Sequence, residues 1–368
     1  MHCMGSRVYV CHTFYHLYVT VMKELNIRRI SSKCENKADL LLSTMSNDFG
    51  NIKERLDRSD VFANVFMFDE KKDETCDAVM AYHEDKGNIF ANMFQRIKYT
   101  RMLGKLQEKE IPVDMKSYDD VYVFCDSDPI GYYLNYKKVH YHALEDGLNS
   151  GMLDDQARNA NKGAWGLKCF LAQLGLIFIE SGYSKYCIDY EVNDISVNHK
   201  PPKNAKEVSF ESMWKQLTDE DHHLLVDIFL DNSDRLLQQL EVTNYEKPCV
   251  MILTEPLCSL DVRKKLFDDI VKIYEEDYTV IFKPHPRDEL DYETEFPNQV
   301  VIKERFPMEV MNDISGLEVE KLISVITQVN CVYFAKRIEY LGLDFLDKYE
   351  EPSIHRKTEL LDKQRNRI

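Results

Sequence analysis

The sequence has 368 residues, which is more than one ordinary hydrophobic core usually holds, so two domains are expected. Hydrophobic residues make up 44% and charged residues 30%, proportions typical of a soluble globular protein. The formal net charge is −16, and no basic stripe is interleaved with aromatic residues. Nucleic acid is therefore not expected as a partner, because phosphate-binding proteins carry a basic face.

The cysteines and the apolar runs indicate the compartment. The ten cysteines include no CxxC pair and no histidine at zinc-finger spacing, so free thiols in a reducing compartment are expected. The apolar run from Val8 to Met22 is interrupted by His12 and His16 and follows no basic segment, which argues against a signal peptide. No apolar stretch reaches the roughly 18 residues of a membrane span. These features predict a cytoplasmic protein.

Short apolar runs alternate with longer amphipathic runs in the first half of the chain. β-Strands are expected at Arg7–Cys11, Asp39–Thr44, Val61–Phe68, Asp120–Cys125 and Lys138–Leu144. The clearest helical pattern runs from Asn88 to Lys109. Strands separated by helices are typical of parallel β/α units, so the fold class is predicted to be α/β.

The second half repeats this alternation. Strands are expected at Cys249–Thr254, Thr279–Lys283, Val300–Lys303, Leu322–Ile326 and Val332–Phe334, and helices at Ser259–Glu276 and Phe306–Met311. Between the halves lies a polar segment, 198–206, with two adjacent prolines, which indicates a linker.

These elements predict two Rossmann-like domains that face a central cleft. The first would span residues 1–197 and the second residues 207–345, followed by a C-terminal helix or tail over 346–368. Ligands of such folds bind outside the carboxyl ends of the strands, so the residues that follow each strand are the ones to consider.

Glu145, Asp146 and Gly147 come directly after the strand expected to end at Leu144. A carboxylate at that position could act as a general base on a sugar hydroxyl. Asp-Gly is also a common turn pair, and an acidic turn is the simpler interpretation when these residues are taken alone.

A proline lies on each side of His285, directly after the strand expected to end at Lys283. Pro284 and Pro286 stiffen the backbone and fix the direction of the imidazole, which suits a fixed contact with a phosphate. A structural histidine in a proline-rich turn is the equally weighted alternative.

Two later segments add possible nucleotide contacts. Glu309 follows Pro307 at an expected helix start, where a glutamate is favoured by the helix dipole and could also hold ribose hydroxyls. Ser324 and Thr327 end another expected strand and offer hydroxyls that could reach a phosphate.

The order of these motifs resembles that of the bacterial GT-B sialyltransferases, the group that includes lipooligosaccharide sialyltransferases and capsule polysialyltransferases. The matching segments are Glu145-Asp146-Gly147, His285-Pro286, Pro307-Met308-Glu309 and Ser324 to Thr327. The opening segment from Val8 to Leu17 also resembles the first strand and turn of these enzymes. The sequence departs from the pattern after Thr327, where Gln328 replaces a second serine or threonine.

The resemblance implies an inverting transfer of sialic acid from CMP-sialic acid to a cell-surface glycan, without a cofactor or a covalent enzyme intermediate. Asp146 would be the general base, with Glu145 as the next candidate, and His285 would face the departing phosphate. Glu309 would hold the ribose and Thr327 the phosphate. Lys283, Pro286 and Ser324 complete the implied nucleotide site.

A metal-dependent chemistry has one candidate motif. Asp126-Ser127-Asp128 has the DxD form by which many sugar transferases hold a divalent ion. Pro129 and Gly131 follow, so an aspartate-rich turn explains the motif as well, and no metal site is expected. The pairs His222/His223 and His140/His142 are interpreted as solvated and packed side chains, respectively.

Two other functions stay open at this point. The first is a CDP-glycerol or CDP-ribitol phosphotransferase, which uses a similar Lys-x-His-Pro strand end, although the second histidine motif of that family is missing. The second is a non-catalytic GT-B protein that only binds a nucleotide sugar. A basic C-terminal segment, Ser353–Ile368, is either a solvated tail or a peripheral contact with an anionic membrane.

Overall fold

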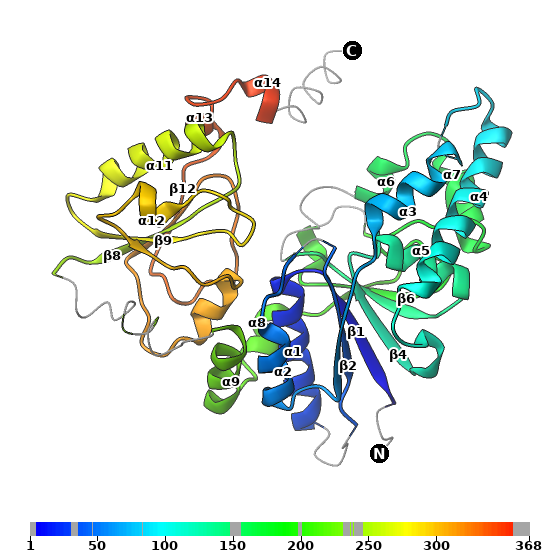
Figure 1. Ribbon diagram of the computed structural model, residues 1–368, viewed down its shortest axis with the longest axis horizontal. Helices are drawn as coiled ribbons and strands as arrows, with labels where there is room; N and C mark the ends of the chain where they lie inside the picture. Colours follow the sequence, from blue (N-terminus) through cyan, green and yellow to red (C-terminus); the bar gives the residue numbers. More distant parts are fainter. Residues whose placement is uncertain are drawn as a thin grey trace. The chain divides into compact units, whose positions relative to one another are not determined.

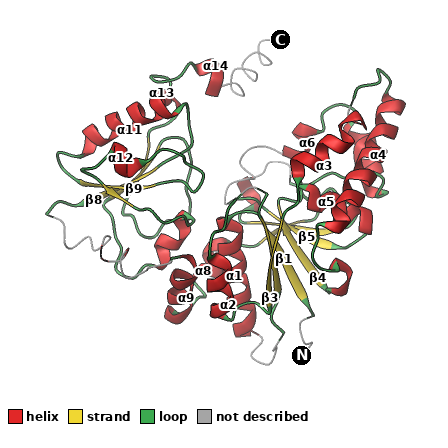
Figure 2. Cartoon of the chain, viewed as in Figure 1, coloured by secondary structure: helices red, strands yellow, loops and turns green. Residues whose placement is uncertain are grey.

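The computed structural model describes residues 5–30, 36–45, 47–82, 84–147, 156–197, 201–230, 236, 238 and 246–355. The chain divides into two compact units, which we call unit 1 (Met1–Leu224) and unit 2 (Leu225–Ile368). Each unit is an α/β layer structure built on one parallel sheet, as Figures 1 and 2 show.

Unit 1 contains a seven-stranded sheet in the order β3-β2-β1-β4-β5-β6-β7. All neighbouring strands pair in parallel. The strands are β1 (Arg7–Cys11), β2 (Asp39–Ser43), β3 (Asn64–Phe68), β4 (Asp120–Phe124), β5 (Tyr141–Leu144), β6 (Cys187–Val192) and β7 (Ala205–Glu207). Because the strands are parallel, all their carboxyl ends lie along one edge of the sheet.

Helices connect these strands and cover both faces of the sheet. In Figure 1, α1, α2 and α8 lie on one side of the strands, and α4, α5 and α7 lie on the other. The described helices are α1 (Phe14–Ile30), α2 (Ile52–Ser59), α3 (Lys72–Val79), α4 (Ile89–Leu106), α5 (Pro129–Lys137), α6 (Gln156–Ala160), α7 (Trp165–Gln173), α8 (Phe210–Trp214) and α9 (Asp219–Phe229). Short 3₁₀ helices are η1 (Met80–Tyr82), η2 (Gln107–Lys109), η3 (Met115–Ser117) and η5 (Ile195–Val197).

The centre of unit 1 is the continuous apolar run of β1, whose five side chains are all buried. Such runs are typical of parallel strands that are covered on both faces. Two charged side chains share this core: Arg7 forms an ion pair with Glu24 at 2.8 Å, and both side chains are inaccessible to solvent. Tyr9 donates a third hydrogen bond to Glu24, so the buried carboxylate is fully satisfied.

Unit 2 contains a five-stranded parallel sheet in the order β10-β9-β8-β11-β12. Its strands are β8 (Cys249–Leu253), β9 (Thr279–Lys283), β10 (Val300–Val301), β11 (Lys321–Ser324) and β12 (Ile338–Tyr340). Its described helices are α11 (Leu260–Tyr274), α12 (Tyr292–Glu295), α13 (Leu343–Leu346), α14 (Pro352–His355) and the 3₁₀ helix η7 (Met308–Asp313). α11 buries its apolar stripe against the sheet through Leu266, Phe267 and Ile270.

The predicted strands are confirmed at the centres of both sheets and at the edges formed by β3 and β10, but not at the opposite edges, formed by β7 and β12. The residues predicted as the strand Val332–Phe334 are a loop, and the edge strand lies further on, at β12. Phe334 is buried although it lies in a loop, so its apolar side chain does not indicate a strand. β12 is largely exposed and therefore lacks the apolar run from which a buried strand is predicted. The helix predicted at Phe306–Met311 is the 3₁₀ helix η7.

The boundary between the units falls later than the predicted linker. Residues 205–206 of that segment belong to β7, which pairs with β6 and extends the first sheet. The division lies at Leu224 and Leu225, inside α9. β7 is short, polar and half exposed, so its sequence shows no strand pattern. The predicted tail begins inside unit 2, because Leu346 packs in the core of that unit; residues 356–368 lie outside the described residues.

Within the part of the chain that the structure describes, no helix is both long and apolar enough to cross a bilayer.

Gly131 provides a test of packing in unit 1. A Cβ at this position in α5 would lie 1.8 Å from the carbonyl oxygen of Asp126 and 2.5 Å from Phe178. We expect Gly131→Ala to lower the free energy of unfolding by about 1–3 kcal/mol, because the overlap involves backbone. Gly166 in α7 is the control, since its Cβ would meet no atom within 4 Å, and Gly166→Ala should be neutral or stabilise by about 0.5–1 kcal/mol. Urea unfolding of both variants measures the difference, and equal effects would contradict this packing.

Candidate active site

Three neighbouring strands of unit 1 bring polar residues to one place. β1, β4 and β5 lie side by side, and the residues after their carboxyl ends are His12, Cys125 and Asp146. His16, in the first turn of α1, joins them because α1 begins directly after β1. The predicted acidic motif is therefore part of a larger polar cluster.

Asp146 accepts a hydrogen bond from His16 at 2.8 Å between Nε2 and Oδ1. The backbone N–H of His12 donates to Nδ1 of His16 at 3.1 Å, which places the imidazole proton on Nε2 and makes His16 the donor to Asp146. His16 is fully buried and stacks on Phe124 with 4.4 Å between the ring centroids. Burial lowers the pKa of His16, so the ring is neutral at pH 7.

Cys125 donates a second hydrogen bond to the same oxygen, at 2.7 Å between Sγ and Oδ1 of Asp146. Its backbone has φ of 51°, a left-handed conformation that is uncommon for a non-glycine residue and that aims the thiol at the carboxylate. Burial, together with the negative charge of Asp146, raises the pKa of Cys125, so it stays a thiol and a donor.

The two donors leave Asp146 ionised and half open to solvent. The hydrogen bond from His16 lowers the pKa of Asp146 to about 2. The side chain is 63% exposed, and no described residue donates a hydrogen bond to Oδ2. An oriented, charged carboxylate with one free oxygen can accept a proton, although a pKa of about 2 makes it a weak base.

Glu145 lies in a different environment from its neighbour. Its side chain is buried and accepts a hydrogen bond from the backbone N–H of Asn193 at 2.7 Å. This contact joins the end of β5 to the segment after β6, and burial raises the pKa of Glu145 to about 7. Glu145 lines a small pocket with Tyr15 and Lys23, but it does not share the exposed position of Asp146.

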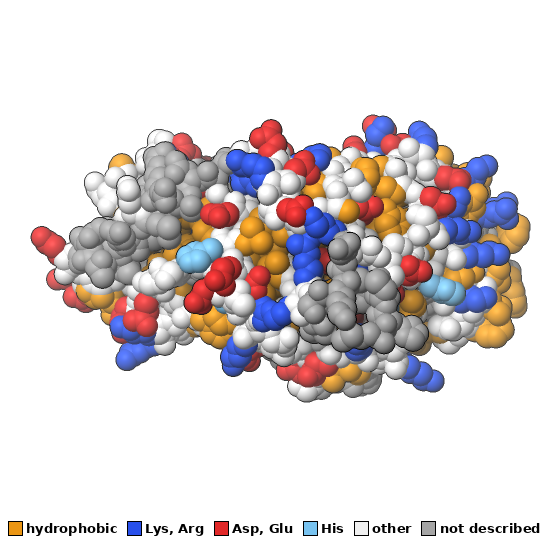
Figure 3. All heavy atoms as spheres, turned by 90° about the horizontal axis from the view of Figure 1, so that it is seen from below, with side chains coloured by type: hydrophobic (Ala, Val, Ile, Leu, Met, Phe, Trp, Pro, Cys, Tyr) orange, Lys and Arg blue, Asp and Glu red, His pale blue; other side chains and the backbone are white. Residues whose placement is uncertain are grey.

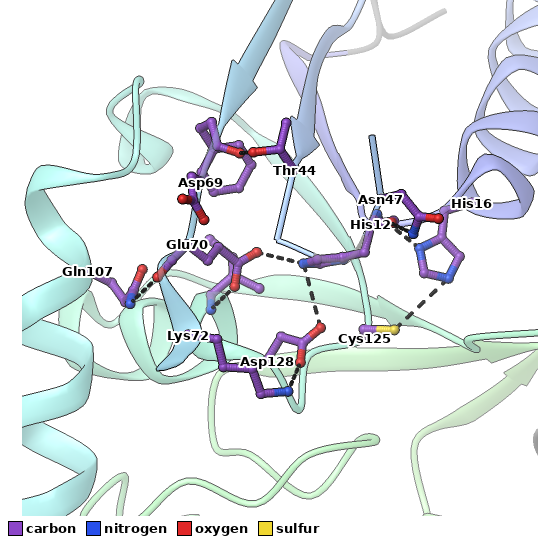
Figure 4. Close-up of polar contacts among 12 residues, drawn as sticks. His12, His16, Thr44, Asn47, Asp69, Glu70, Lys72, Gln107, Cys125 and Asp128 are labelled. Carbon is purple, nitrogen blue, oxygen red and sulfur yellow. Dashed lines mark hydrogen bonds and ion pairs between the residues drawn. The ribbon is translucent and has the colours of Figure 1, made fainter. Parts of the chain in front are cut away.

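Both aspartates of the DxD motif, Asp126 and Asp128, contact other side chains of unit 1. Asp126 is buried and accepts hydrogen bonds from the Tyr141 hydroxyl at 2.9 Å and from the Ser181 backbone, and burial raises its pKa to about 7. Asp128 instead forms an ion pair with Lys72 at 2.9 Å, as Figure 4 shows. The two carboxylates therefore have separate protein partners.

His12 belongs to the same buried network. Its Nε2 lies 2.6 Å from Oε1 of Glu70 and 3.8 Å from Asp128 (Figure 4). Burial alone would lower the pKa of His12, but the two carboxylates outweigh it and raise the pKa. Glu70 also accepts the backbone N–H of Ile130 at 3.1 Å, so this residue anchors the start of α5.

A metal ion does not suit this cluster, although ligand atoms of His12, His16 and Cys125 lie within 4.8 Å of one another. A neutral imidazole that binds a metal through Nε2 carries its proton on Nδ1. In His16 that proton would point at the backbone N–H of His12. Coordination would therefore break the hydrogen bond that orients His16.

In unit 2, His285 follows β9 and is oriented by two backbone contacts. Its own N–H donates to the Thr254 hydroxyl at 3.0 Å, and the N–H of Arg287 donates to its Nδ1 at 3.1 Å. The second contact places the imidazole proton on Nε2. Burial, aided by the positive charges of Arg287 and Lys283, lowers the pKa of His285 to about 4, so the ring is neutral at pH 7 and can donate from Nε2.

Asp288 stabilises this turn through a network of buried hydrogen bonds. Its side chain is fully buried and accepts hydrogen bonds from Thr254 at 2.7 Å, Arg263 at 2.5 Å and Tyr292 at 2.8 Å. Thr254 thus links the buried carboxylate to the backbone of His285. The two prolines and this network together fix the direction of the imidazole.

The predicted phosphate site at the end of β11 already contains a carboxylate. One oxygen of Glu255 accepts the backbone N–H groups of Val325, Ile326 and Thr327 at 3.0, 3.0 and 3.2 Å. The Ser324 hydroxyl lies between this oxygen, at 3.0 Å, and the carbonyl oxygen of Thr327, at 2.6 Å. Converging backbone amides of this kind form an anion-binding nest, and here the anion is the protein's own side chain.

The other predicted nucleotide contacts differ in accessibility. Lys283 is buried and donates to the carbonyl oxygen of Phe306 at 2.9 Å, so it braces the next loop, and burial lowers its pKa to about 7. Glu309, in η7, is half buried, and burial raises its pKa to about 7. Pro286 is half buried beside His285, Thr327 is exposed, and Ser324 is fully buried.

Sequence reasoning missed most of the residues that support Asp146 and His285. His12 and His16 interrupt an apolar run, Thr254 is the last residue of a predicted strand, and Glu255 directly follows it. Their role depends on which strands are neighbours, which the sequence does not state.

Comparisons with known proteins identify the family. The model of glycosyltransferase family 52 matches residues 61–332. A curated protein of Haemophilus influenzae, described as an uncharacterized protein, is 24% identical over 212 residues, which are 56% of this chain and 63% of that protein. The chain thus matches less than two thirds of that relative's length.

Solved structures show the fold. The GT-B domain of a sialyltransferase from Photobacterium damselae has a TM-score of 0.50 and 12% identity, and the match covers 88% of this chain and 86% of that one. An alpha/beta-galactoside alpha-2,3-sialyltransferase from Photobacterium phosphoreum has a TM-score of 0.45 and 12% identity, with 86% and 85% covered.

The predicted α/β fold of GT-B type is therefore confirmed, and the family agrees with the resemblance that the motifs suggested. The match spans more than half of the chain, from β3 of unit 1 to the loop after β11 of unit 2. The chain belongs to glycosyltransferase family 52.

Proposed function

We propose that this protein is an inverting glycosyltransferase that moves sialic acid from CMP-sialic acid to a hydroxyl group of a glycan. The observation that carries the proposal is Asp146, a charged and exposed carboxylate at a strand end with one oxygen fixed by His16 and Cys125. Its free oxygen would take the proton of the acceptor hydroxyl as that hydroxyl attacks the anomeric carbon. A single displacement of this kind inverts the configuration.

His285 would act on the donor. A neutral imidazole with its proton on Nε2 can donate a hydrogen bond to the phosphate of CMP as negative charge develops there. The Pro-His-Pro turn and Asp288 fix the ring before the substrate arrives, so little reorganisation is needed.

The remaining donor contacts follow from accessibility. Among the predicted nucleotide contacts, Glu309 is half buried and Thr327 is exposed, so both side chains can reach a ligand. We propose that Glu309 holds the ribose and Thr327 the phosphate. Ser324 and Lys283 have protein partners, and we propose that they shape the site without touching the donor. Glu145 is likewise proposed to support the turn that carries Asp146.

The acceptor is proposed to be a cell-surface glycan of lipooligosaccharide or capsule type. Transfer would then take place in the cytoplasm, at the inner face of the plasma membrane. A CDP-linked donor and mere nucleotide binding are the alternatives that the following measurements separate.

We expect the nucleotide site to prefer CMP over CDP, UDP and GDP, because one phosphate suffices for His285 and Thr327 and the family resemblance is to CMP-sugar enzymes. Calorimetry with the four nucleotides measures the preference. Tighter binding of a uridine or guanosine nucleotide would rule out the proposed donor, and tighter binding of CDP would favour a phosphotransferase.

We expect transfer to survive excess EDTA. Asp126 and Asp128, the DxD carboxylates, have Tyr141 and Lys72 as partners, and the single phosphate of a CMP-sugar can be balanced by hydrogen bonds. Product formation is measured with and without the chelator. If the chelator abolishes turnover and magnesium or manganese restores it, the DxD carboxylates would be assigned a metal-binding role.

Replacing Asp146 and His285 should have different effects. Asp146→Asn keeps the shape but cannot accept a proton, so kcat should fall by about 10²–10⁴ while CMP binds normally. His285→Ala removes a hydrogen bond to a charged group and should weaken CMP binding by roughly 10–100-fold. Glu145→Gln is the control, because a buried amide oxygen can still accept the Asn193 N–H, and its kcat should stay near that of the wild type.

Calorimetry and transfer assays on the three variants separate these roles. If Asp146→Asn transfers sugar normally and Glu145→Gln does not, the base is Glu145. If His285→Ala binds CMP normally and keeps its activity, the Pro-His-Pro segment is only a rigid turn.

A further inference from the structure

α4 and α7 of unit 1 expose an unusual number of large apolar side chains. Phe90 and Phe94 on α4 are 78% and 58% exposed, and Phe170 on α7 is 60% exposed. Ile89, Leu167, Leu174 and Leu176, in or directly after the same helices, are also exposed. Soluble proteins rarely leave several large apolar residues together in water unless the surface binds something.

These side chains form stripes on the outer faces of the two helices. Phe90 and Phe94 are four residues apart, and Leu167, Phe170 and Leu174 follow at spacings of three and four, so each set lies on one helix face. The inner face of α4 is already used, because Tyr99 and Leu103 are buried. The outer stripes therefore face solvent.

The two helices are neighbours in the fold. Ile97 of α4 packs with Trp165 and Leu171 of α7 in one cluster. Arg96 of α4 donates to the carbonyl oxygen of Phe178 at 3.3 Å, just beyond α7. Their outer faces thus form one continuous surface, which we call the α4–α7 face, and Figure 1 shows the two helices at the same end of unit 1.

The charge of this face is opposite to that of the chain. All charged residues in its helices are basic, although the whole protein has a formal net charge of −16. The basic residues are Arg96, Lys98, Arg101 and Lys105 in α4, and Arg158, Lys162 and Lys168 in or beside α6 and α7. The nearest preceding carboxylates, Glu84 and Asp85, are paired with Lys86 and Asn92.

The basic and apolar residues are interleaved, so the expectation that no basic stripe lies among aromatic residues is wrong for α4. Lys98 lies 4.6 Å from the ring centroid of Phe94, and Arg158 lies 5.4 Å from that of Trp165. At the right-hand end of Figure 3, in the region of α4 and α7, hydrophobic and basic side chains lie next to one another. Aromatic anchors bordered by Lys and Arg are typical of helices that lie in the interface of an anionic bilayer.

We propose that the α4–α7 face docks unit 1 on an anionic lipid surface. Phe90, Phe94 and Phe170 enter the boundary between headgroups and acyl chains, and the basic residues contact lipid phosphates. A symmetric pairing with a second copy of the chain is disfavoured, because it would bring two sets of basic residues together. This proposal does not depend on the transfer reaction and differs from a contact through the C-terminal segment.

Co-sedimentation with vesicles of phosphatidylcholine, with and without phosphatidylglycerol, tests the proposal on the full chain. The apolar variant is Phe90→Ser, Phe94→Ser and Phe170→Ser, and its control is Ile273→Ser, a 56% exposed residue of α11 in unit 2. We expect the apolar variant to lose binding by on the order of 100-fold or more. The control should bind as the wild type does.

The charge variant replaces Lys98, Arg101 and Lys105 by glutamine. Its control replaces Lys265, Lys272 and Lys348, three exposed lysines of unit 2. Each basic residue near an anionic surface contributes about a fivefold change in partitioning, so the charge variant should lose on the order of 100-fold on phosphatidylglycerol vesicles only. All replaced residues are exposed, and circular dichroism and thermal unfolding should be unchanged.

Three outcomes would overturn the proposal. The first is a wild-type chain that does not bind anionic vesicles. The second is binding that survives both variants of the face but is lost when Arg356, Lys357, Lys363, Arg365 and Arg367 are replaced by glutamine, which would assign the contact to the C-terminal segment. The third is an apolar variant with unchanged vesicle binding and an altered sedimentation coefficient, which would show that the face binds protein.

Discussion

A carboxylate that is taken out of water must receive hydrogen bonds or become protonated, and this constraint shapes both units. Glu24 accepts hydrogen bonds from Arg7 and Tyr9. Glu255 accepts hydrogen bonds from three backbone N–H groups, and Asp288 accepts them from three side chains. Each set of donors fixes the loop that supplies it. Asp146 differs because its donors reach only one oxygen and leave the side chain exposed.

The two units orient a histidine in the same way. In each, a backbone N–H donates to Nδ1, from His12 to His16 in unit 1 and from Arg287 to His285 in unit 2. Both rings are therefore neutral, with the proton on Nε2. The difference lies in what Nε2 meets, because His16 donates to Asp146, whereas no described residue receives the Nε2 proton of His285. One histidine positions a side chain, and the other is available to a ligand.

The hydrogen bond from His16 has two opposite effects on Asp146. It keeps the carboxylate charged and oriented, but it also lowers its pKa to about 2 and so weakens it as a proton acceptor. The proposed role consequently requires the acceptor hydroxyl to become acidic as its bond to the sugar forms. Glu255 imposes a similar constraint in unit 2, since it fills the backbone nest where a phosphate could bind. In the proposed function, the donor phosphate would therefore be held by side chains.

The sequence by itself determined the α/β class, the central strands of both sheets and the positions of Asp146 and His285, because buried parallel strands are continuous apolar runs and ligands gather at their ends. It did not reveal β6, β7 or β12, whose residues are partly exposed and lack that signal. Only the tertiary structure separated Glu145 from Asp146 and gave Ser324 a buried partner in Glu255. Whether a polar side chain faces solvent or a hydrogen-bond donor of the protein depends on strands that are distant in sequence. The local sequence pattern carries no information about which strands are neighbours.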